Sequence, residues 1–169
     1  MSRSATRISK KIERRGAVKD DELRQTGTKT VFSESFIGTV FEEDDFDGAV
    51  FTSGNLYCVA ITGSNLDQTR IEECSMQDAQ FRNMAMKNAS FQAVDLKNVS
   101  FRDACLTGAS VKHLDMTEAA FENMNLSEST FWNCSLAGTS FEGCNWEKAT
   151  INGIPVVELL ETYDRVHGV

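Results

Sequence analysis

Long apolar runs and proline are both scarce in this chain of 169 residues, which contains a single proline. Its apolar runs are only a few residues long, whereas a membrane-crossing helix needs about 20 apolar residues. No apolar segment follows the basic N-terminus to form a secretory signal. We therefore expect a soluble, cytoplasmic protein without a membrane partner. The opening MSRSATRISKKIERR also has some features of an organelle transit peptide, but Glu13 and the acidic residues 20–22 count against that alternative.

Cysteine and histidine are too few and too irregularly spaced for a metal centre or a disulfide framework. The five cysteines are odd in number and include no C-x-x-C pair, and the only histidines are His113 and His167. Zinc sites and disulfide frameworks both need paired, regularly spaced ligands or thiols. We therefore predict reduced cysteines, no metal and no cofactor.

A five-residue period dominates the rest of the sequence. From Phe36 to Ile151, one large apolar residue stands at every fifth position without interruption, giving 24 consecutive repeats. The first twelve of these centres are Phe36, Phe41, Phe46, Phe51, Leu56, Ile61, Leu66, Ile71, Met76, Phe81, Met86 and Phe91. The last twelve are Leu96, Phe101, Leu106, Val111, Met116, Phe121, Leu126, Phe131, Leu136, Phe141, Trp146 and Ile151. Neither the 3.6-residue period of a helix nor the two-residue period of a strand explains this spacing.

Turn-forming residues occur at one fixed phase of the same period. In half of the 24 repeats, a glycine or an asparagine lies two residues after the apolar centre, as Gly108 follows Leu106. These residue types tolerate the positive φ that the third position of a type II turn requires. The residue two positions before each centre is mostly small and must also point inward. The pattern predicts a corner every five residues.

The stretch ASFQAVDLKNVSFRDACLTGAS resembles the pentapeptide-repeat proteins, and the resemblance covers residues 34–153. It implies an all-β fold, a right-handed quadrilateral β-helix in which four repeats make one coil. The 24 repeats then give about six coils and a rod about 29 Å long, since stacked strands lie about 4.8 Å apart. With four repeats per coil, the bulky partner residues Met84, Val94, Leu114 and Met124 fall on the faces with fewer phenylalanine centres. We expect these residues to fill the core, the alternative being a ligand pocket.

The two ends of the chain depart from the repeat. Residues 1–33 carry nine basic and four acidic residues, so we expect a basic, flexible arm there, and the early repeats predict a distorted first coil. Residues 154–169 predict a short helix whose apolar stripe is Val156, Leu159, Leu160 and Tyr163. This helix is expected to cap the last coil over Trp146 and Ile151. In quinolone-resistance members of the family a C-terminal element also dimerises the protein, so a homodimer through the stripe is a second expectation.

No catalytic motif is present, because the sequence has no phosphate loop, no HExxH and no GxSxG pattern. Most carboxylates fall at outward positions, where nothing excludes water, so we expect no enzyme. Trp132 follows the centre Phe131 and must also point outward, beside Lys112 of the preceding coil and near His113. It either anchors an interface or lies flat over the Lys112 side chain as a cation–π contact. The other candidate interaction residues are Arg82, Arg102 and Tyr57.

Charge distinguishes two functional hypotheses. Residues 34–153 have a net charge of −11, made up of −8 in 34–73, +2 in 74–113 and −5 in 114–153. Some family members are acidic rods that mimic DNA and bind type II topoisomerases such as DNA gyrase, and a duplex of about 29 Å carries about 17 negative charges. Candidate positions for such mimicry are Glu42, Asp44, Asp45, Asp47 and Glu142. Because the basic middle interrupts the acidic rod, we rank a protein-binding scaffold first and a mimic for gyrase or topoisomerase IV second. The net charge of −8 for the whole chain disfavours direct nucleic-acid binding.

Overall fold

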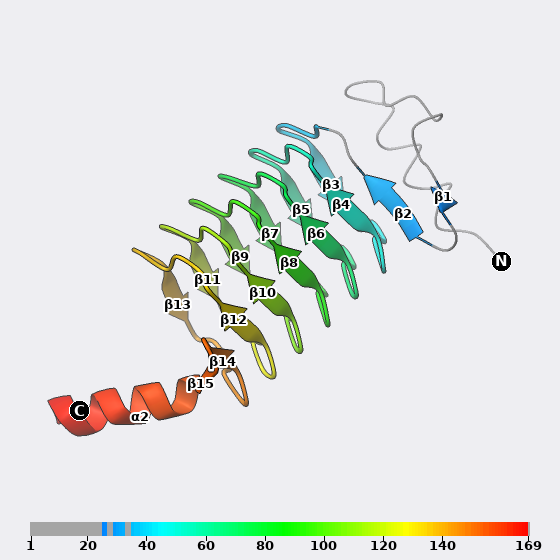
Figure 1. Ribbon diagram of the computed structural model, residues 1–169. Coiled ribbons are helices and arrows are strands. Elements are labelled where there is room, and N and C mark those ends of the chain that lie inside the picture. The colour runs from blue at the N-terminus through cyan, green and yellow to red at the C-terminus, as the bar shows by residue number, and fades with distance from the viewer. Residues whose placement is uncertain (1–24, 27–28, 33–34, 169) are drawn as a thin grey trace.

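The computed structural model describes residues 25–26, 29–32 and 35–168, and it shows a rod of stacked coils with a helix at its C-terminal end (Figure 1). One sheet contains β1 (Gln25–Thr26), β2 (Lys29–Phe32), β4 (Val50–Thr52), β6 (Arg70–Glu72), β8 (Ser90–Gln92), β10 (Ser110–Lys112), β12 (Thr130–Trp132), β14 (Thr150–Ile151) and β15 (Ile154–Pro155). The other contains β3 (Val40–Glu42), β5 (Ala60–Thr62), β7 (Gln80–Arg82), β9 (Ser100–Arg102), β11 (Ala120–Glu122) and β13 (Ser140–Glu142).

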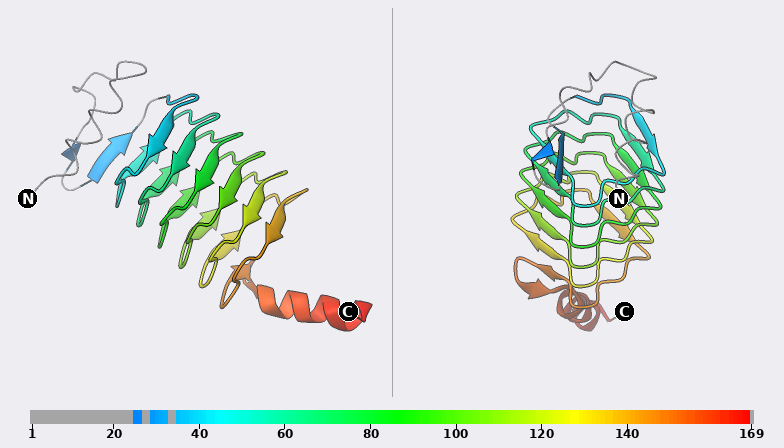
Figure 2. Two further views of the ribbon diagram at one scale, coloured as in Figure 1. Left: turned by 180° about the vertical axis from the view of Figure 1, so that it is seen from behind. Right: turned by 90° about the vertical axis from the view of Figure 1, so that its right-hand side faces the viewer.

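Residues that pair between successive coils of the repeat lie twenty positions apart in the sequence. Phe81 pairs in parallel with Phe101, and Phe101 with Phe121, along the odd-numbered strands. Single parallel bridges such as Asn55↔Ser75 and Asp45↔Asn65 connect successive coils on the other two walls. Twenty residues per coil confirm the prediction of four repeats per coil, and the coils are viewed along the rod in Figure 2.

The corners of the coil lie where the turn signals place them. All 24 positions two residues after a centre have positive φ, whether the residue is Gly108 (φ 69°) or Ala93 (φ 53°). At every second corner a backbone hydrogen bond closes a four-residue turn, as from the N–H of Ala109 to the carbonyl of Leu106. A positive φ confined to the third residue is the geometry of a type II turn.

The inward side chains form one apolar core. Phe81, Phe101, Phe121 and Phe141 stack face to face along the rod, with centroid distances of 4.5, 5.1 and 4.8 Å. In the first coil the rings meet edge to face instead, as Phe41 and Phe46 do at 5.5 Å. The partner residues Met84, Val94, Leu114 and Met124 are buried in the same core, as predicted.

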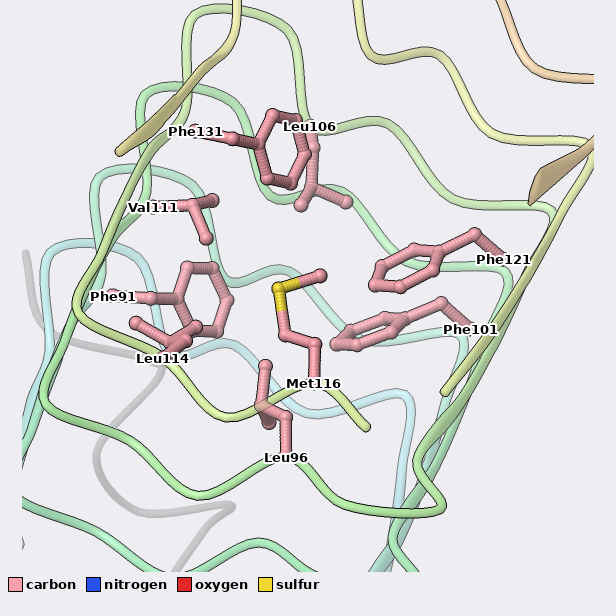
Figure 3. Close-up of a pocket in the computed structure, with 9 residues that line it drawn as sticks. All are labelled: Phe91, Leu96, Phe101, Leu106, Val111, Leu114, Met116, Phe121 and Phe131. Atoms are coloured by element: carbon pink, nitrogen blue, oxygen red, sulfur yellow. The ribbon is translucent and has the colours of Figure 1, made fainter. Parts of the chain in front are cut away.

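A small void interrupts this packing where Val111 stands between Phe91 and Phe131 in the column of centres (Figure 3). Valine lacks the volume of the rings on either side. The void holds about 10 Å³ and is lined by apolar side chains that include Leu114 and Met116. A void of this size is at the lower limit for one water molecule, which would also need two or more polar partners that the apolar lining lacks. The void is therefore a packing imperfection rather than a ligand site.

Strand pairing extends to the N-terminal side of the predicted repeat. β2 runs parallel to β4, but Val31 pairs with Val50 and Phe32 with Phe51, an offset of nineteen residues instead of twenty. β1 turns back onto β2 as an antiparallel strand. Residues 25–26 and 29–32, which fall within the predicted basic arm, thus continue the even-numbered sheet. The corners of the first complete coil have the same positive φ as those of the other coils. The backbone distortion that we expected in this coil is therefore absent. The rest of the predicted arm lies outside the described residues.

At the C-terminal end, β15 folds back on β14 and leads into α2 (Val156–His167), which confirms the predicted helix. Pro155 precedes the helix, and Gly168 ends it with φ 70°. The helix leaves the end of the rod instead of lying across it (Figures 1 and 2). Val156 alone is buried among its residues, so the expected lid over Trp146 and Ile151 is not formed within a single chain.

Candidate interaction surfaces

The outer walls place residues from successive coils side by side. Because each coil adds twenty residues, Lys112 on β10 lies directly beside Trp132 on β12. Arg82 on β7 lies beside Arg102 on β9 in the other sheet. The structure therefore separates the predicted interaction residues into groups on different walls.

Trp132 stands outward from the even-numbered sheet with 52% of its surface exposed. Its Cζ3 atom lies 3.9 Å from the position that a Cβ on Gly153 would occupy, so the indole leans toward the last coil. Among the described residues no cation–π contact is recorded between Trp132 and Lys112, its neighbour on the paired strand. A surface hollow of about 500 Å³ opens beside the indole. Lys112, His113, Thr130, Phe131, Trp132, Thr150 and Gly153 line it.

His113 occupies a corner at the edge of this hollow, with φ 57°. The side-chain N–H of Asn133 donates a hydrogen bond of 2.9 Å to Nδ1 of His113. The Oδ1 atom of Asn152 accepts the backbone N–H of Asn133 at 2.8 Å. Because Nδ1 is the acceptor, the imidazole proton sits on Nε2, which remains a donor for a bound group.

The basic residues in the middle of the rod differ in whether a carboxylate neutralises them. Arg102 pairs with Glu122, and Nζ of Lys97 lies 3.1 Å from Asp115. Both pairs are exposed and weaken as salt rises. Arg82 and Lys112 form no ion pair with any residue of the described chain.

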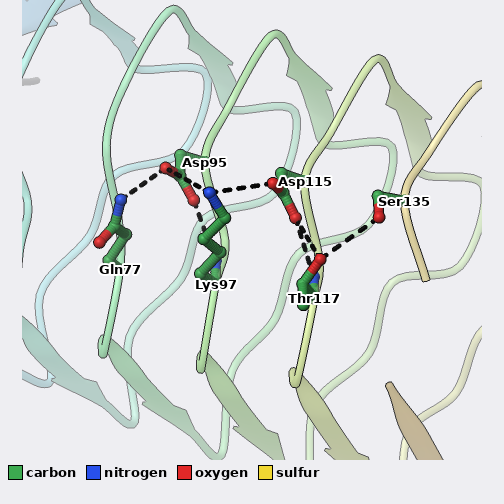
Figure 4. A network of polar contacts seen from close by, with 6 residues as sticks. All are labelled: Gln77, Asp95, Lys97, Asp115, Thr117 and Ser135. Carbon is green, nitrogen blue, oxygen red and sulfur yellow. Dashed lines mark hydrogen bonds and ion pairs between the residues drawn. The ribbon is translucent and has the colours of Figure 1, made fainter. Parts of the chain in front are cut away.

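A ladder of polar side chains runs along another wall (Figure 4). Asp95 accepts hydrogen bonds from Gln77 and from the backbone of Lys97, while Asp115 accepts from the hydroxyl and backbone N–H of Thr117. The bonds from Thr117, followed by the ammonium of Lys97, lower the pKa of the Asp115 carboxyl below its ordinary value. Our sequence analysis missed this ladder.

The ladder belongs to a wider set of Asx turns. Seven Asp or Asn residues directly before a centre accept the backbone N–H two residues on, namely Asp45, Asn55, Asn65, Asp95, Asp115, Asn125 and Asn145. Each bond fastens the start of a type II turn. The repeated Asp or Asn before a centre was the signal for it.

Tyr57 lies at the opposite end of the rod from Trp132, in the same outward row as Ile37 of the first coil. Ile37 is 59% exposed and Tyr57 39% exposed. A hydrogen bond with Asp78, then one with Cys58, raises the pKa of the Tyr57 hydroxyl. These apolar side chains form a second exposed patch.

The five acidic positions assigned to DNA mimicry are not equivalent. Glu42, Asp45, Asp47 and Glu142 are exposed, the first three near the N-terminal end and Glu142 on β13 near the other end. Asp44 is only 8% exposed, because it occupies the inward phase of its repeat, and its backbone N–H donates to Ser64 Oγ. Asp44 is therefore not displayed as the prediction required.

The C-terminal end of the core is partly open. Leu136, Phe141, Trp146 and Ile151 are only partly buried in the last coil, whereas the first-coil phenylalanines are buried. On α2, Leu159 and Leu160 are 40% and 52% exposed and Tyr163 is 58% exposed. The predicted stripe is thus present, with Val156 buried at its start and Tyr163 stacked on His167 of the same helix, whereas Leu159 and Leu160 are left exposed.

In the described part of the chain, no three His, Cys, Asp or Glu side chains gather closely enough to hold a metal ion. Burial raises the pKa of the Cys74, Cys134 and Cys144 thiols, which leaves them protonated, and all five cysteines are free. None of the helices among the described residues has the length and apolar character to cross a membrane.

Family models match most of the repeat: a pentapeptide repeat region at residues 34–111, and pentapeptide repeats in eight copies at residues 115–153. No curated protein matches the sequence. Among solved structures, HetL from the cyanobacterium Nostoc, a pentapeptide repeat protein involved in heterocyst differentiation regulation, is 18% identical with a TM-score of 0.46. The match covers 70% of this chain and 60% of HetL, so the chain spans less than two thirds of that protein.

Two further solved structures have similar scores. A pentapeptide repeat protein from the thylakoid lumen of Arabidopsis thaliana is 22% identical, with a TM-score of 0.44 and coverage of 78% of this chain and 74% of that one. QnrB1, a plasmid-mediated fluoroquinolone resistance protein, is 17% identical in a trypsin-treated variant, with a TM-score of 0.42 and coverage of 70% and 79%. These likenesses concern the fold alone.

Proposed function

Because the chain belongs to the pentapeptide-repeat family, we propose that it is a non-catalytic cytoplasmic scaffold that binds a partner protein through its outer walls. One observation carries the proposal: large apolar side chains point outward although the inward positions already form a continuous core. Ile37 and Tyr57 near one end and Trp132 near the other are not needed for that core. Exposed apolar patches bordered by polar residues are typical of interaction sites.

A quantitative pull-down from the native host tests this function. The bait is the full chain, compared with Trp132→Ala and with a double variant, Ile37→Ser with Tyr57→Ser. These side chains lie outside the core, so each variant should fold and melt as the wild type does. We expect at least one variant to lose a partner that the wild type captures, and that partner should bind the purified chain directly. Equal capture by all three proteins would contradict the proposal.

A mimic of DNA for a type II topoisomerase is the second candidate. The observation in its favour is the acidic N-terminal end, where Glu42, Asp45 and Asp47 are exposed within a segment of net charge −8. The ion pairs of Lys97 and Arg102 also neutralise part of the basic middle. Arg82 and Lys112 still interrupt the acidic surface, where a duplex would be uniformly negative. The scaffold therefore remains the first candidate.

A further inference from the structure

The surroundings of Trp132 differ in charge from the rest of this acidic protein. None of the residues lining the hollow carries a carboxylate, although the chain has a net charge of −8. The same wall bears Glu72 and Glu73 two coils before Lys112, about 10 Å away along the rod. The lining therefore offers a bound group the ammonium of Lys112 and hydroxyl groups but no carboxylate. The neighbouring Glu128, two residues before Thr130, is paired with Lys148.

Each lining group suits a specific part of a ligand. The ammonium of Lys112 is unpaired among the described residues, and Nε2 of His113 is left as a donor while Asn133 occupies Nδ1. Thr130 and Thr150 add hydroxyl donors. The half-exposed indole of Trp132 offers an apolar face next to these groups. A ligand with an anionic group next to an apolar side chain would contact both the polar lining groups and the indole.

We infer that this hollow binds an acidic peptide segment of the partner protein, with carboxylates toward Lys112 and His113 and an apolar side chain against Trp132. The inference rests on the proposed function and specifies the chemistry of the partner. A polypeptide fits better than a nucleic acid, because a phosphate backbone needs a track of cations. Among the residues that line the hollow, Lys112 is the single lysine.

The test uses the full chain and a defined probe, a blocked peptide of alternating glutamate and phenylalanine. Calorimetry measures binding to each variant. Emission from Trp132 is followed in a Trp146→Phe background, which leaves Trp132 as the only tryptophan. We expect saturable binding that shifts this emission and weakens as salt rises. Trp132→Ala should weaken binding at least about tenfold, as loss of an aromatic anchor does.

Lys112→Gln should weaken binding about two- to fivefold, the range for one exposed ion pair. Lys87→Gln is the matched control, since Lys87 is an exposed lysine on another wall and its loss should change nothing. The same peptide with lysine in place of glutamate should not bind.

Three results would overturn the inference. The first is no binding of the acidic peptide, or equal binding of the lysine peptide. The second is tighter binding of single-stranded oligothymidylate, which would assign the hollow to nucleic acid. The third is a Trp132 emission shift that appears with protein concentration alone and disappears in Leu160→Glu, which would assign the hollow to α2 of a second copy. Capture of a partner through Ile37 and Tyr57 would leave the proposed function intact in each case.

Discussion

At the scale of single residues, backbone strain is concentrated at the corners of the coil. Half of the 24 corners have neither glycine nor asparagine, yet residues such as Ala93, Glu118 and Lys148 adopt φ near 55° there. A residue with a Cβ pays roughly 1–2 kcal/mol in this left-handed region. The stacked core and the strand pairing hold these residues in place, since each corner is fixed by the coils on either side.

Ala93→Gly should stabilise the protein by up to about 1 kcal/mol, because glycine relieves the strain of the positive φ. Ala137→Gly is the matched control, since Ala137 is also exposed but does not have a positive φ. In Ala137→Gly the free energy of unfolding should fall by about 0.5–1 kcal/mol, because glycine gives the unfolded chain more conformational freedom. Urea unfolding measures both, and equal losses in the two variants would show that corner strain is not the governing term.

At the scale of an element, the polar ladder couples the fold to pH. The pKa of Asp115 is lowered chiefly by the hydrogen bonds from Thr117, with a smaller effect of Lys97. A carboxyl with a lowered pKa in the folded state adds stability above its unfolded pKa. This contribution disappears as pH falls through the lowered folded value.

Thr117→Val should raise the pKa of Asp115 toward its ordinary value of 3.8, because the hydroxyl donor is lost while the backbone donor remains. Carboxyl-carbon NMR measures the shift, and unfolding should show a smaller loss of stability in acid than for the wild type. Lys97→Met should raise the pKa by a smaller amount. If Lys97→Met raised the pKa of Asp115 more than Thr117→Val does, Lys97 rather than Thr117 would be the main cause of the lowered pKa.

The C-terminal helix is the element whose surroundings are incomplete. Leu159, Leu160 and Tyr163 of the stripe are exposed and the core of the last coil is only partly buried. Within the described residues, β13 pairs with β11 alone. We propose that two copies associate through this end, since burial of exposed apolar surface favours association.

Leu160→Glu should therefore produce a monomer where the wild type sediments as a dimer across a concentration series. Thr162→Glu adds the same charge to α2 outside the stripe and should leave the dimer in place. A wild type that sediments as a monomer throughout would remove the proposal.

At the scale of the whole molecule, the distribution of charge separates the two candidate functions. Replacing Arg82 and Arg102 with glutamate changes residues 74–113 from a net charge of +2 to about −2, closer to a uniform rod of duplex charge. If the rod mimics DNA, inhibition of gyrase supercoiling should strengthen in this variant and weaken as salt rises. A scaffold that binds through the walls gains nothing from the change.

Lys148→Glu is the control, because it adds the same kind of charge outside the basic middle. Because Lys148→Glu changes the net charge by −2 and the double variant by −4, an effect half as large in this variant would point to total charge rather than to its distribution. If neither the wild type nor the double variant affects supercoiling, gyrase is not the target.

The sequence by itself determined the repeating interior. The five-residue period placed every apolar centre and every positive-φ corner, and it predicted the phenylalanine stack from Phe81 to Phe121. It also placed Trp132 outward beside Lys112. These predictions succeed because one rule, a large residue inward every five positions, must hold in every coil for the strands to stack.

Only the tertiary structure decided what does not repeat. It showed that Trp132 leans toward Gly153 and opens a hollow, that β2 joins the sheet one residue out of register, and that α2 leaves its stripe uncovered. The five-residue period restricts only the inward side chains. The conformations of the outer side chains and of the terminal segments depend on the residues that they contact. Those neighbours come from different coils and different elements, and their contacts follow no period in the sequence.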